Sequence, residues 1–214
     1  MKWRSGDDMV ADPGDAALGR HKARGSGQPG PLRMFFRGFL KRPAMVASVI
    51  PSSARLIERM LAPVDWANAR VFVEYGPGVG TFCEPILDRM APDATLIAID
   101  TNPDFIAYLR RRIGDSRFVP IHASAADVRA LLAAHGHSHA DYILSGLPFS
   151  TLPPGIGARI ASETAAALRP GGAFLVYQFS PRVRALIAPH FARIDEAFEW
   201  FNIPPARLYW GWKA

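Results

Sequence analysis

Two hydrophobic periods alternate in the part of the chain that follows residue 70. Short runs rich in β-branched and aromatic residues are separated by stretches in which apolar residues recur at helical spacing. The runs predict strands at residues 71–74, 95–100, 118–121, 142–144, 173–179, 194–201 and 208–213. The stretches between them predict helices at residues 82–90, 103–113, 125–134, 157–168 and 182–190. This alternation indicates βαβ units, so we predict one α/β domain, residues 63–214, on a largely parallel seven-stranded sheet.

The residues before this domain follow other patterns. Residues 1–30 are rich in Gly, Asp, Ser and Ala without a sustained period, which predicts a flexible tail. Residues 31–62 begin with a short basic amphipathic helix, which is expected to seat on a membrane. Its membrane-binding side chains would be Arg33, Phe35, Phe36, Arg37, Phe39 and Lys41. The alternative is a helix packed on the protein's own sheet. A second, linking helix is expected after the segment PSS (51–53), with a serine as its cap.

Charge and composition narrow the functional classes. The net charge of +6 and the pI of about 9.9 favour an anionic partner, which can be nucleic acid, an acidic lipid surface or a phosphorylated substrate. The single cysteine, Cys83, excludes an intramolecular disulfide framework and a multi-cysteine zinc site. No apolar run approaches the roughly 20 residues that cross a bilayer. We therefore expect a cytoplasmic protein that does not span a membrane.

A glycine-rich loop follows the first predicted strand. The segment EYGPGVG (74–80) places an acidic residue and three alternating glycines between a strand and a helix. Glycine permits a tight turn there and lets a ligand approach the amides at the start of the helix. A dinucleotide-binding loop would carry its third glycine or alanine at Thr81, whereas this chain has it at Gly80. The spacing therefore favours a cofactor other than a dinucleotide.

A carboxylate, Asp100, ends the second predicted strand, where it can accept hydrogen bonds from both hydroxyls of a ribose. The alternative is an ordinary tight turn followed by a helix-capping aspartate. The glycine loop resembles the first motif of the Rossmann-like class I methyltransferases. The resemblance implies S-adenosylmethionine as cofactor, S-adenosylhomocysteine as product and no metal. The implied cofactor-binding residues are Glu74, Gly76, Gly78, Gly80, Asp100, Thr101, Ser124, Ala125, Ser145, Gly146, Ser52 and Ser53. Ser124 stands where the wider family often has an aspartate that contacts adenine.

The segment LSGLPF (144–149) follows the fourth predicted strand. Amine methyltransferases carry Asn or Asp here, then Pro and an aromatic residue, and the ribosomal RNA adenine dimethyltransferases carry Asn-Leu-Pro-Tyr or Phe. This chain keeps Leu147, Pro148 and Phe149 but has Gly146 where the amide stands. Because that amide holds the planar exocyclic amine of adenine, a nucleobase is a poorer candidate substrate.

The stretch from residue 35 to residue 213 is similar to the bacterial phospholipid N-methyltransferases, which convert phosphatidylethanolamine stepwise to phosphatidylcholine. The resemblance is carried by FLKRP (39–43), VIPSS (49–53), the glycine loop, SGLPF (145–149) and the Trp-rich end (200–212). It implies a phospholipid substrate, an anionic membrane surface as partner, no nucleic acid, and a place on the inner face of the cytoplasmic membrane.

An alkyl amine must lose a proton before it accepts a methyl group, because it is mostly protonated at neutral pH. Aromatic faces suit the positive charge that passes from sulfur to nitrogen. Phe149 and Tyr177 stand at the carboxyl ends of predicted strands, where open α/β sheets bind ligands, so both are candidate catalytic residues. Tyr75, beside the glycines, is a weaker candidate. Core packing is the alternative for Tyr177.

Two other functions remain open at this point. RNA adenine methylation is supported by the basic pI and opposed by Gly146, and a non-catalytic lipid-surface module is opposed by the intact cofactor motif. The histidines of the segment AHGHSHA (134–140) lie in a predicted loop where no carboxylate or cysteine completes an obvious set of metal ligands, which predicts a solvated loop instead of a metal site.

Overall fold

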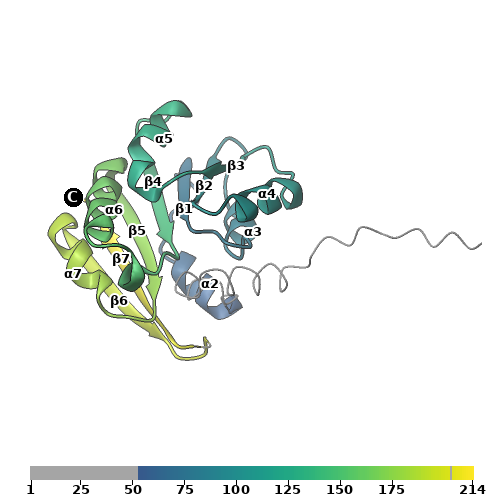
Figure 1. The fold of residues 1–214 in the computed structure, drawn as a ribbon. Helices are drawn as coiled ribbons and strands as arrows, with labels where there is room; N and C mark the ends of the chain where they lie inside the picture. Colours follow the sequence, from purple (N-terminus) through teal and green to yellow (C-terminus); the bar gives the residue numbers. More distant parts are fainter. Residues whose placement is uncertain (1–52, 203) are drawn as a thin grey trace, which may run out of the picture.

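The computed structural model describes residues 53–202 and 204–214, which form a sheet covered by helices on both faces (Figure 1). The seven strands have the order β3-β2-β1-β4-β5-β7-β6. They are β1 (Val71–Tyr75), β2 (Thr95–Asp100), β3 (Phe118–His122), β4 (Ala140–Ser145), β5 (Leu168–Gln178), β6 (Arg193–Glu199) and β7 (Ala206–Trp212). Strands β1 to β5 pair in parallel, whereas β7 runs antiparallel to both β5 and β6. The predicted seven-stranded α/β fold is confirmed.

The helices form the two outer layers. One face of the sheet is covered by α2 (Ala54–Leu61), α3 (Cys83–Leu87) and α4 (Pro103–Arg112), and the other by α5 (Val128–Ala134), α6 (Ile156–Ala167) and α7 (Val183–Ile187). The described residues also contain three short 3₁₀ turns, at η2 (Ala125–Asp127), η3 (Phe149–Thr151) and η4 (Ala188–His190). No helix in the described ranges has both the length and the apolar composition needed to cross a bilayer.

The central strand β1 shows why the sheet is buried on both faces. Every residue of β1 is buried. Phe72 packs into the cluster beneath α2 and α3, whereas Val71 and Val73 pack into the cluster beneath α5 and α6. Alternate side chains of a strand point to opposite faces, so a strand covered by helices on both sides reads as a continuous apolar run.

Helix α2 joins the start of the described chain to the end of the sheet. The Ser53 hydroxyl accepts a hydrogen bond from the Leu56 amide at 3.2 Å, which confirms the predicted serine cap. Leu56 and Met60 are fully buried. The Arg59 guanidinium donates to the Phe198 carbonyl and to the Glu199 carboxylate, each at 2.9 Å. The helix is therefore fixed to the last residues of β6. The predicted amphipathic helix within residues 31–42 lies outside the described residues.

Several predicted boundaries differ from the observed ones. The helix predicted at 182–190 divides into α7 and η4, where Pro189 supplies no amide hydrogen to continue the α-helix. The strand predicted at 173–179 begins earlier, at Leu168. The strand predicted at 194–201 ends at Glu199, so Trp200 and Phe201 belong to the turn between β6 and β7.

Candidate active site

The predicted site residues come from five strands whose carboxyl ends lie along one edge of the sheet. The strand order brings the segments after β3, β2, β1, β4 and β5 side by side in that sequence. The register pairs Tyr75 with Ile99 and with Ser145, and Ser145 with Val176, so neighbouring strands end at nearly the same level. This edge is where an open α/β sheet binds its ligands.

The glycine loop after β1 has the conformation that its sequence requires. Gly76, Gly78 and Gly80 have φ values of +64°, +56° and +84°, in the left-handed region. Space is restricted as well as conformation, because a β-carbon on Gly80 would lie 2.6 Å from Leu109 Cδ2. The Gly76 amide donates to the Ile99 carbonyl at 2.8 Å, which ties the loop to β2. A ligand bound at this edge of the sheet can therefore approach the backbone of the loop closely.

Asp100 stands beside this loop at the end of β2. Its carboxylate accepts hydrogen bonds from the Asn102 amide at 2.8 Å and from the Gly78 amide at 3.4 Å. Burial raises the pKa of Asp100, and these backbone donors oppose that shift. An acceptor held beside a glycine loop fits the hydroxyls of a ribose, so the residues present suit an adenosyl cofactor.

Glu74 lies near the end of β1, before the glycines of the loop, and its side chain contacts α3. Its side chain is buried, and the Cys83 thiol donates to it at 3.1 Å. Burial raises the pKa of Glu74 to about 7, and the nearby charge of Asp100 adds to the rise. Burial also raises the pKa of the Cys83 thiol. This pair links β1 to the first turn of α3 and fixes where the helix begins.

The remaining predicted cofactor residues have mixed outcomes. Thr101 follows Asp100, and its carbonyl oxygen accepts a hydrogen bond from His122 Nε2 at 3.1 Å. Ser124 caps the turn η2 by accepting from the Ala126 amide, and Ala125 is buried beside it. Ser53 is used as a helix cap, and Ser52 lies outside the described residues. The cofactor-binding roles of these five residues stay predictions.

The fourth strand leads into the substrate side of the edge. Ser145 is fully buried, and its hydroxyl accepts from the Leu147 amide at 3.2 Å. The Gly146 amide donates to the Tyr75 carbonyl at 3.1 Å, so the chain after β4 stays attached to β1 at the base of the glycine loop. This attachment places Gly146 between the cofactor loop and the end of β5.

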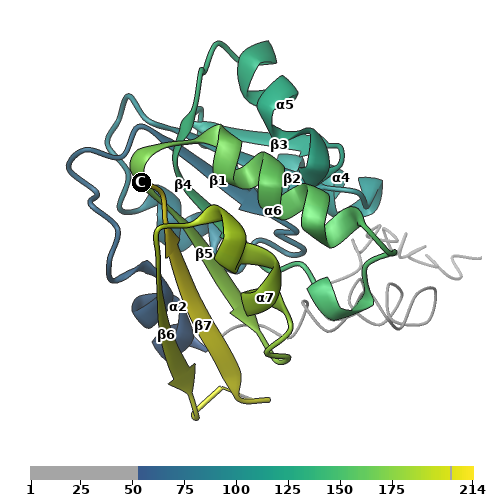
Figure 2. The ribbon, with the colours of Figure 1, turned by 90° about the vertical axis from the view of Figure 1, so that its left-hand side faces the viewer.

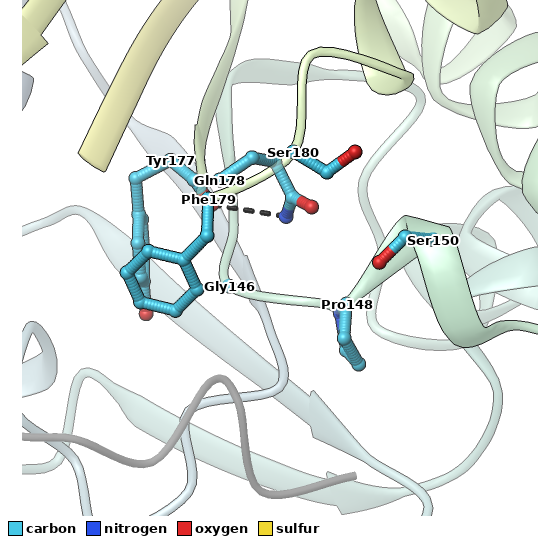
Figure 3. Close-up of a pocket in the computed structure, with 7 residues that line it drawn as sticks. All are labelled: Gly146, Pro148, Ser150, Tyr177, Gln178, Phe179 and Ser180. Carbon is cyan, nitrogen blue, oxygen red and sulfur yellow. Dashed lines mark hydrogen bonds between the residues drawn. The ribbon is translucent and has the colours of Figure 1, made fainter. Parts of the chain in front are cut away.

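A cavity of about 260 Å³ opens at the ends of β4 and β5 (Figure 3). Its lining residues are Gly146, Pro148, Ser150, Tyr177, Gln178, Phe179 and Ser180. The rings of Tyr177 and Phe179 lie along one side, and Pro148 and Ser150 lie opposite. The cavity has the size of a small polar headgroup, whereas pockets for drug-sized ligands span roughly 300–1,000 Å³.

Tyr177 connects this cavity to the cofactor loop. Its ring stacks on Phe82, the residue that precedes α3, with ring centroids 5.2 Å apart. A β-carbon on Gly146 would lie 2.3 Å from the Tyr177 hydroxyl oxygen. The hydroxyl therefore occupies the space in which a side chain at position 146 would begin. Tyr177 stands at the site that the sequence predicts, and its catalytic role stays a prediction.

Phe149 and Tyr75 do not face this cavity. Phe149 is buried, and its ring packs edge-on against Phe174 in the core beneath α6, because the turn η3 directs it inward. The Tyr75 hydroxyl is enclosed in the same core and bonds to the Thr164 hydroxyl at 3.1 Å. Neither ring lines the cavity, so the catalytic roles predicted for these two residues gain no support from this geometry and stay predictions. Both stabilise the core.

Phe179 takes the position that we assigned to Phe149. It follows β5, lines the cavity and exposes 37% of its surface. The neighbouring Gln178 donates to the Leu147 carbonyl and, at 2.9 Å, to the Tyr177 carbonyl, which holds the ends of β4 and β5 together. The sequence signal that could have identified Gln178 and Phe179 is their place at the end of the fifth predicted strand. No pattern in the sequence indicates that Phe82 contacts Tyr177.

The described residues contain no group of three or more His, Cys, Asp or Glu side chains that could hold a metal ion. His135 contacts the Leu131 carbonyl and His139 contacts Ser138, and both histidines are exposed.

Comparison with known proteins identifies the family. A methyltransferase domain family matches residues 72–172. The ornithine lipid N-methyltransferase of Singulisphaera acidiphila is 32% identical over 178 residues, which cover 82% of this chain and 93% of that protein. The ribosomal RNA small subunit methyltransferase A of Burkholderia multivorans is 34% identical over 103 residues, but these cover only 46% of this chain and 36% of that protein.

A solved structure supports the fold independently. The 1,6-didemethyltoxoflavin-N1-methyltransferase of Burkholderia thailandensis, determined with S-adenosylhomocysteine, matches with a TM-score of 0.59 and 16% identity, covering 88% of this chain and 91% of that one. At this identity the likeness concerns the fold alone. The whole-length relative and the fold together assign the chain to the class I S-adenosylmethionine-dependent methyltransferases, in the same family as the ornithine lipid N-methyltransferase.

Proposed function

We propose that this protein transfers methyl groups from S-adenosylmethionine to the amine of a membrane lipid headgroup. The favoured substrate is phosphatidylethanolamine together with its partly methylated forms, leading to phosphatidylcholine. The observation that carries the proposal is the cavity beside Gly146, where the Tyr177 hydroxyl occupies the space of the missing amide side chain. A small cavity lined by the hydroxyl-bearing side chains of Ser150, Tyr177 and Ser180 and by one exposed aromatic ring suits an alkyl amine better than a planar nucleobase.

The cofactor would lie over the glycine loop. Gly76, Gly78 and Gly80 would let its methionine portion approach the backbone, and Asp100 would bind the ribose hydroxyls. When bound, S-adenosylmethionine supplies an electrophilic methyl group. The cavity at Gly146 adjoins this loop through the Gly146–Tyr75 hydrogen bond and the Phe82–Tyr177 stack, so a bound amine and the methyl donor would meet at this edge.

The protein residues would prepare the amine for attack. Partial burial at the end of β5 disfavours an ammonium ion and so promotes loss of its proton. The Tyr177 hydroxyl can accept a hydrogen bond from the amine and orient its lone pair, while the Phe179 ring can face the positive charge that develops on nitrogen. Orientation of this kind accounts for a large part of the rate in bimolecular transfer reactions.

An ornithine lipid is the second candidate, because the relative that matches over most of both chains is named for that substrate. Both lipids present a primary alkyl amine close to an anionic group. The cavity volume of about 260 Å³ accommodates either headgroup and does not separate them.

The test offers both substrates to the full chain. Purified protein is incubated with methyl-labelled S-adenosylmethionine and vesicles that contain equal amounts of phosphatidylethanolamine, an ornithine lipid and phosphatidylglycerol, and the lipids are separated by headgroup. Label in phosphatidylethanolamine and its methylated products supports the proposal, and label in ornithine lipid alone moves the assignment to the second candidate. Absence of label from both amine lipids would overturn the lipid proposal.

A further inference from the structure

The exposed large apolar side chains of residues 53–202 and 204–214 gather at one edge of the sheet. They are Phe179, Trp200 and Phe201, which expose 37%, 72% and 70% of their surfaces. Phe179 follows the end of β5, and the other two follow the end of β6. Burying such side chains would be favourable, so their exposure at one place marks an interaction surface.

The strand register places these residues on the same side of the molecule as the cavity. Gln178 pairs with Arg207 of β7, and Arg207 pairs with Phe198 of β6. Because neighbouring strands are about 4.8 Å apart, the turn after β6 begins about 10 Å from the cavity wall. The β6–β7 hairpin extends beyond the other strands, at the bottom of Figure 2. The turn of this hairpin, residues 200–202 and 204–205, is called the hairpin tip below.

A buried ion pair holds the hairpin tip in position. The Glu199 carboxylate is fully buried, pairs with Arg59 at 2.9 Å and with Arg55 at 3.4 Å, and accepts the Phe201 amide at 3.0 Å. The Arg59 hydrogen bond keeps the pKa of Glu199 below its usual range. The backbone beneath the exposed rings is therefore anchored to α2, which is unlike a loop that carries apolar residues by chance.

Arginines surround the exposed rings. The Arg55 guanidinium lies over the Phe201 ring at 4.7 Å from its centroid, and Arg207 lies over Phe198 at 5.5 Å. Trp200 packs on the same Phe198 ring at 4.3 Å. Aromatic rings with guanidinium groups beside them suit a bilayer interface, where the rings enter the headgroup layer and the cations meet lipid phosphates.

The start of the described chain lies beside the hairpin tip. The Ser53 amide, at the start of the described chain, donates to the Asn202 side chain in the hairpin tip at 3.0 Å. The first described residue, Ser53, is therefore attached to the hairpin tip.

We propose that the hairpin tip is a membrane-docking element that inserts Trp200 and Phe201 into an anionic bilayer and turns the cavity at the end of β5 toward the lipid headgroups. The proposal rests on the proposed lipid substrate, because only a membrane-embedded substrate gains from this orientation. The occupant of the surface is the bilayer interface itself.

The first experiment measures binding without the methyl donor. The full chain and its Trp200→Ser/Phe201→Ser variant are sedimented with vesicles of phosphatidylethanolamine and phosphatidylglycerol in a 7:3 ratio. We expect the double variant to bind about tenfold or more weakly, since two interfacial aromatic side chains are lost. Arg55→Gln should also weaken binding, whereas Arg111→Gln, an equal change of charge on α4, should not. Equal sedimentation of wild type and double variant would overturn the proposal.

Melting temperature and molecular mass distinguish the other occupants. If another segment of this chain covers the rings, the double variant will melt at a lower temperature and bind vesicles normally. If a second copy covers them, the wild type will be a dimer and the double variant a monomer. Either result would overturn the proposal. Unchanged melting and mass with lost vesicle binding supports it.

A soluble substrate distinguishes failure of membrane docking from failure of the proposed methyl transfer. Dihexanoyl phosphatidylethanolamine, used below its micelle concentration, reaches the cavity without a membrane. We expect the double variant to methylate this lipid at the wild-type rate and to lose activity on vesicles. If the wild type methylates neither form, phosphatidylethanolamine is not the substrate, while the sedimentation result still decides whether the hairpin tip binds the bilayer.

Discussion

The Tyr177 hydroxyl occupies the space beside Gly146 in which the β-carbon of any other residue would stand, 2.3 Å from the oxygen. Gly146 and Tyr177 are therefore a matched pair. The related motif of the nucleobase amine methyltransferases has an amide side chain at the position of Gly146. Here a polar group, the Tyr177 hydroxyl, comes from the neighbouring strand β5.

The matched pair predicts a strong coupling between the two positions. Gly146→Ala should destabilise the fold by about 1–3 kcal/mol, because the new methyl group collides with the tyrosine. In a Tyr177→Leu background the same substitution should cost less than about 0.5 kcal/mol. Urea unfolding of the four proteins of this cycle measures the coupling. Equal costs in both backgrounds would show that Tyr177 does not fill this space.

Removing the hydroxyl alone tests its chemical role. Tyr177→Phe should lower kcat about 10²-fold, since the amine loses the group that orients it, and should leave the melting temperature and cofactor affinity nearly unchanged. Turnover with labelled donor and calorimetric titration give these quantities. A variant with wild-type turnover would make Tyr177 a packing residue.

Substitution of Phe179, which lines the cavity, should affect methylation, whereas substitution of the buried Phe149 should affect stability. Phe179→Ala should slow the second and third methylations more than the first, because the ring faces a cation that becomes progressively poorer at hydrogen bonding. Phe149→Ala should instead destabilise the fold by about 3–5 kcal/mol, as for other large-to-small core changes. Separate quantities of mono-, di- and trimethylated lipid, with melting curves of both variants, test the assignment. A uniform loss over all three steps in Phe179→Ala would contradict it.

Asp100 should determine cofactor affinity. Asp100→Ala should weaken S-adenosylmethionine binding about tenfold to several hundredfold, because charge-assisted hydrogen bonds contribute about 1.5–3 kcal/mol each before compensation. Asp100→Asn is the matched control, since it keeps the acceptor oxygen and should lose less. Calorimetry measures all three affinities, and an unchanged value for Asp100→Ala would remove Asp100 from the site.

Glu74 predicts a dependence of stability on pH. Its pKa rises from the ordinary value of 4.5 to about 7 in the folded protein. The unfolded chain therefore releases this proton first, and the contribution of Glu74 to stability falls as pH rises from about 4.5 to about 7. Relative to wild type, Glu74→Gln should gain about 2–3 kcal/mol between pH 5 and pH 7.5. Chemical unfolding at both pH values tests this, and a pH-independent difference would contradict the burial of an ionisable Glu74.

The predictions from sequence succeeded where local pattern determines structure. The strands, the glycine loop and the Ser53 cap depend on periodicity, backbone conformation and one local hydrogen bond, all of which are visible in the sequence. The buried position of Phe149 could not be predicted, because the residue lies in the turn η3, where strand alternation does not indicate the direction of a side chain. Phe82 meets Tyr177 through a contact between residues 95 positions apart, which requires the assembled sheet.

A competition between lipid and RNA in one reaction tests directly whether the methyl group goes to a lipid amine. The full chain is given a limiting amount of methyl-labelled S-adenosylmethionine, vesicles that contain amine lipids, and ribosomal RNA, with Tyr177→Phe as the matched control. We predict that the label enters the amine lipid fraction and that Tyr177→Phe reduces this transfer about 10²-fold. Label in the RNA, with none in the lipids, would contradict the account.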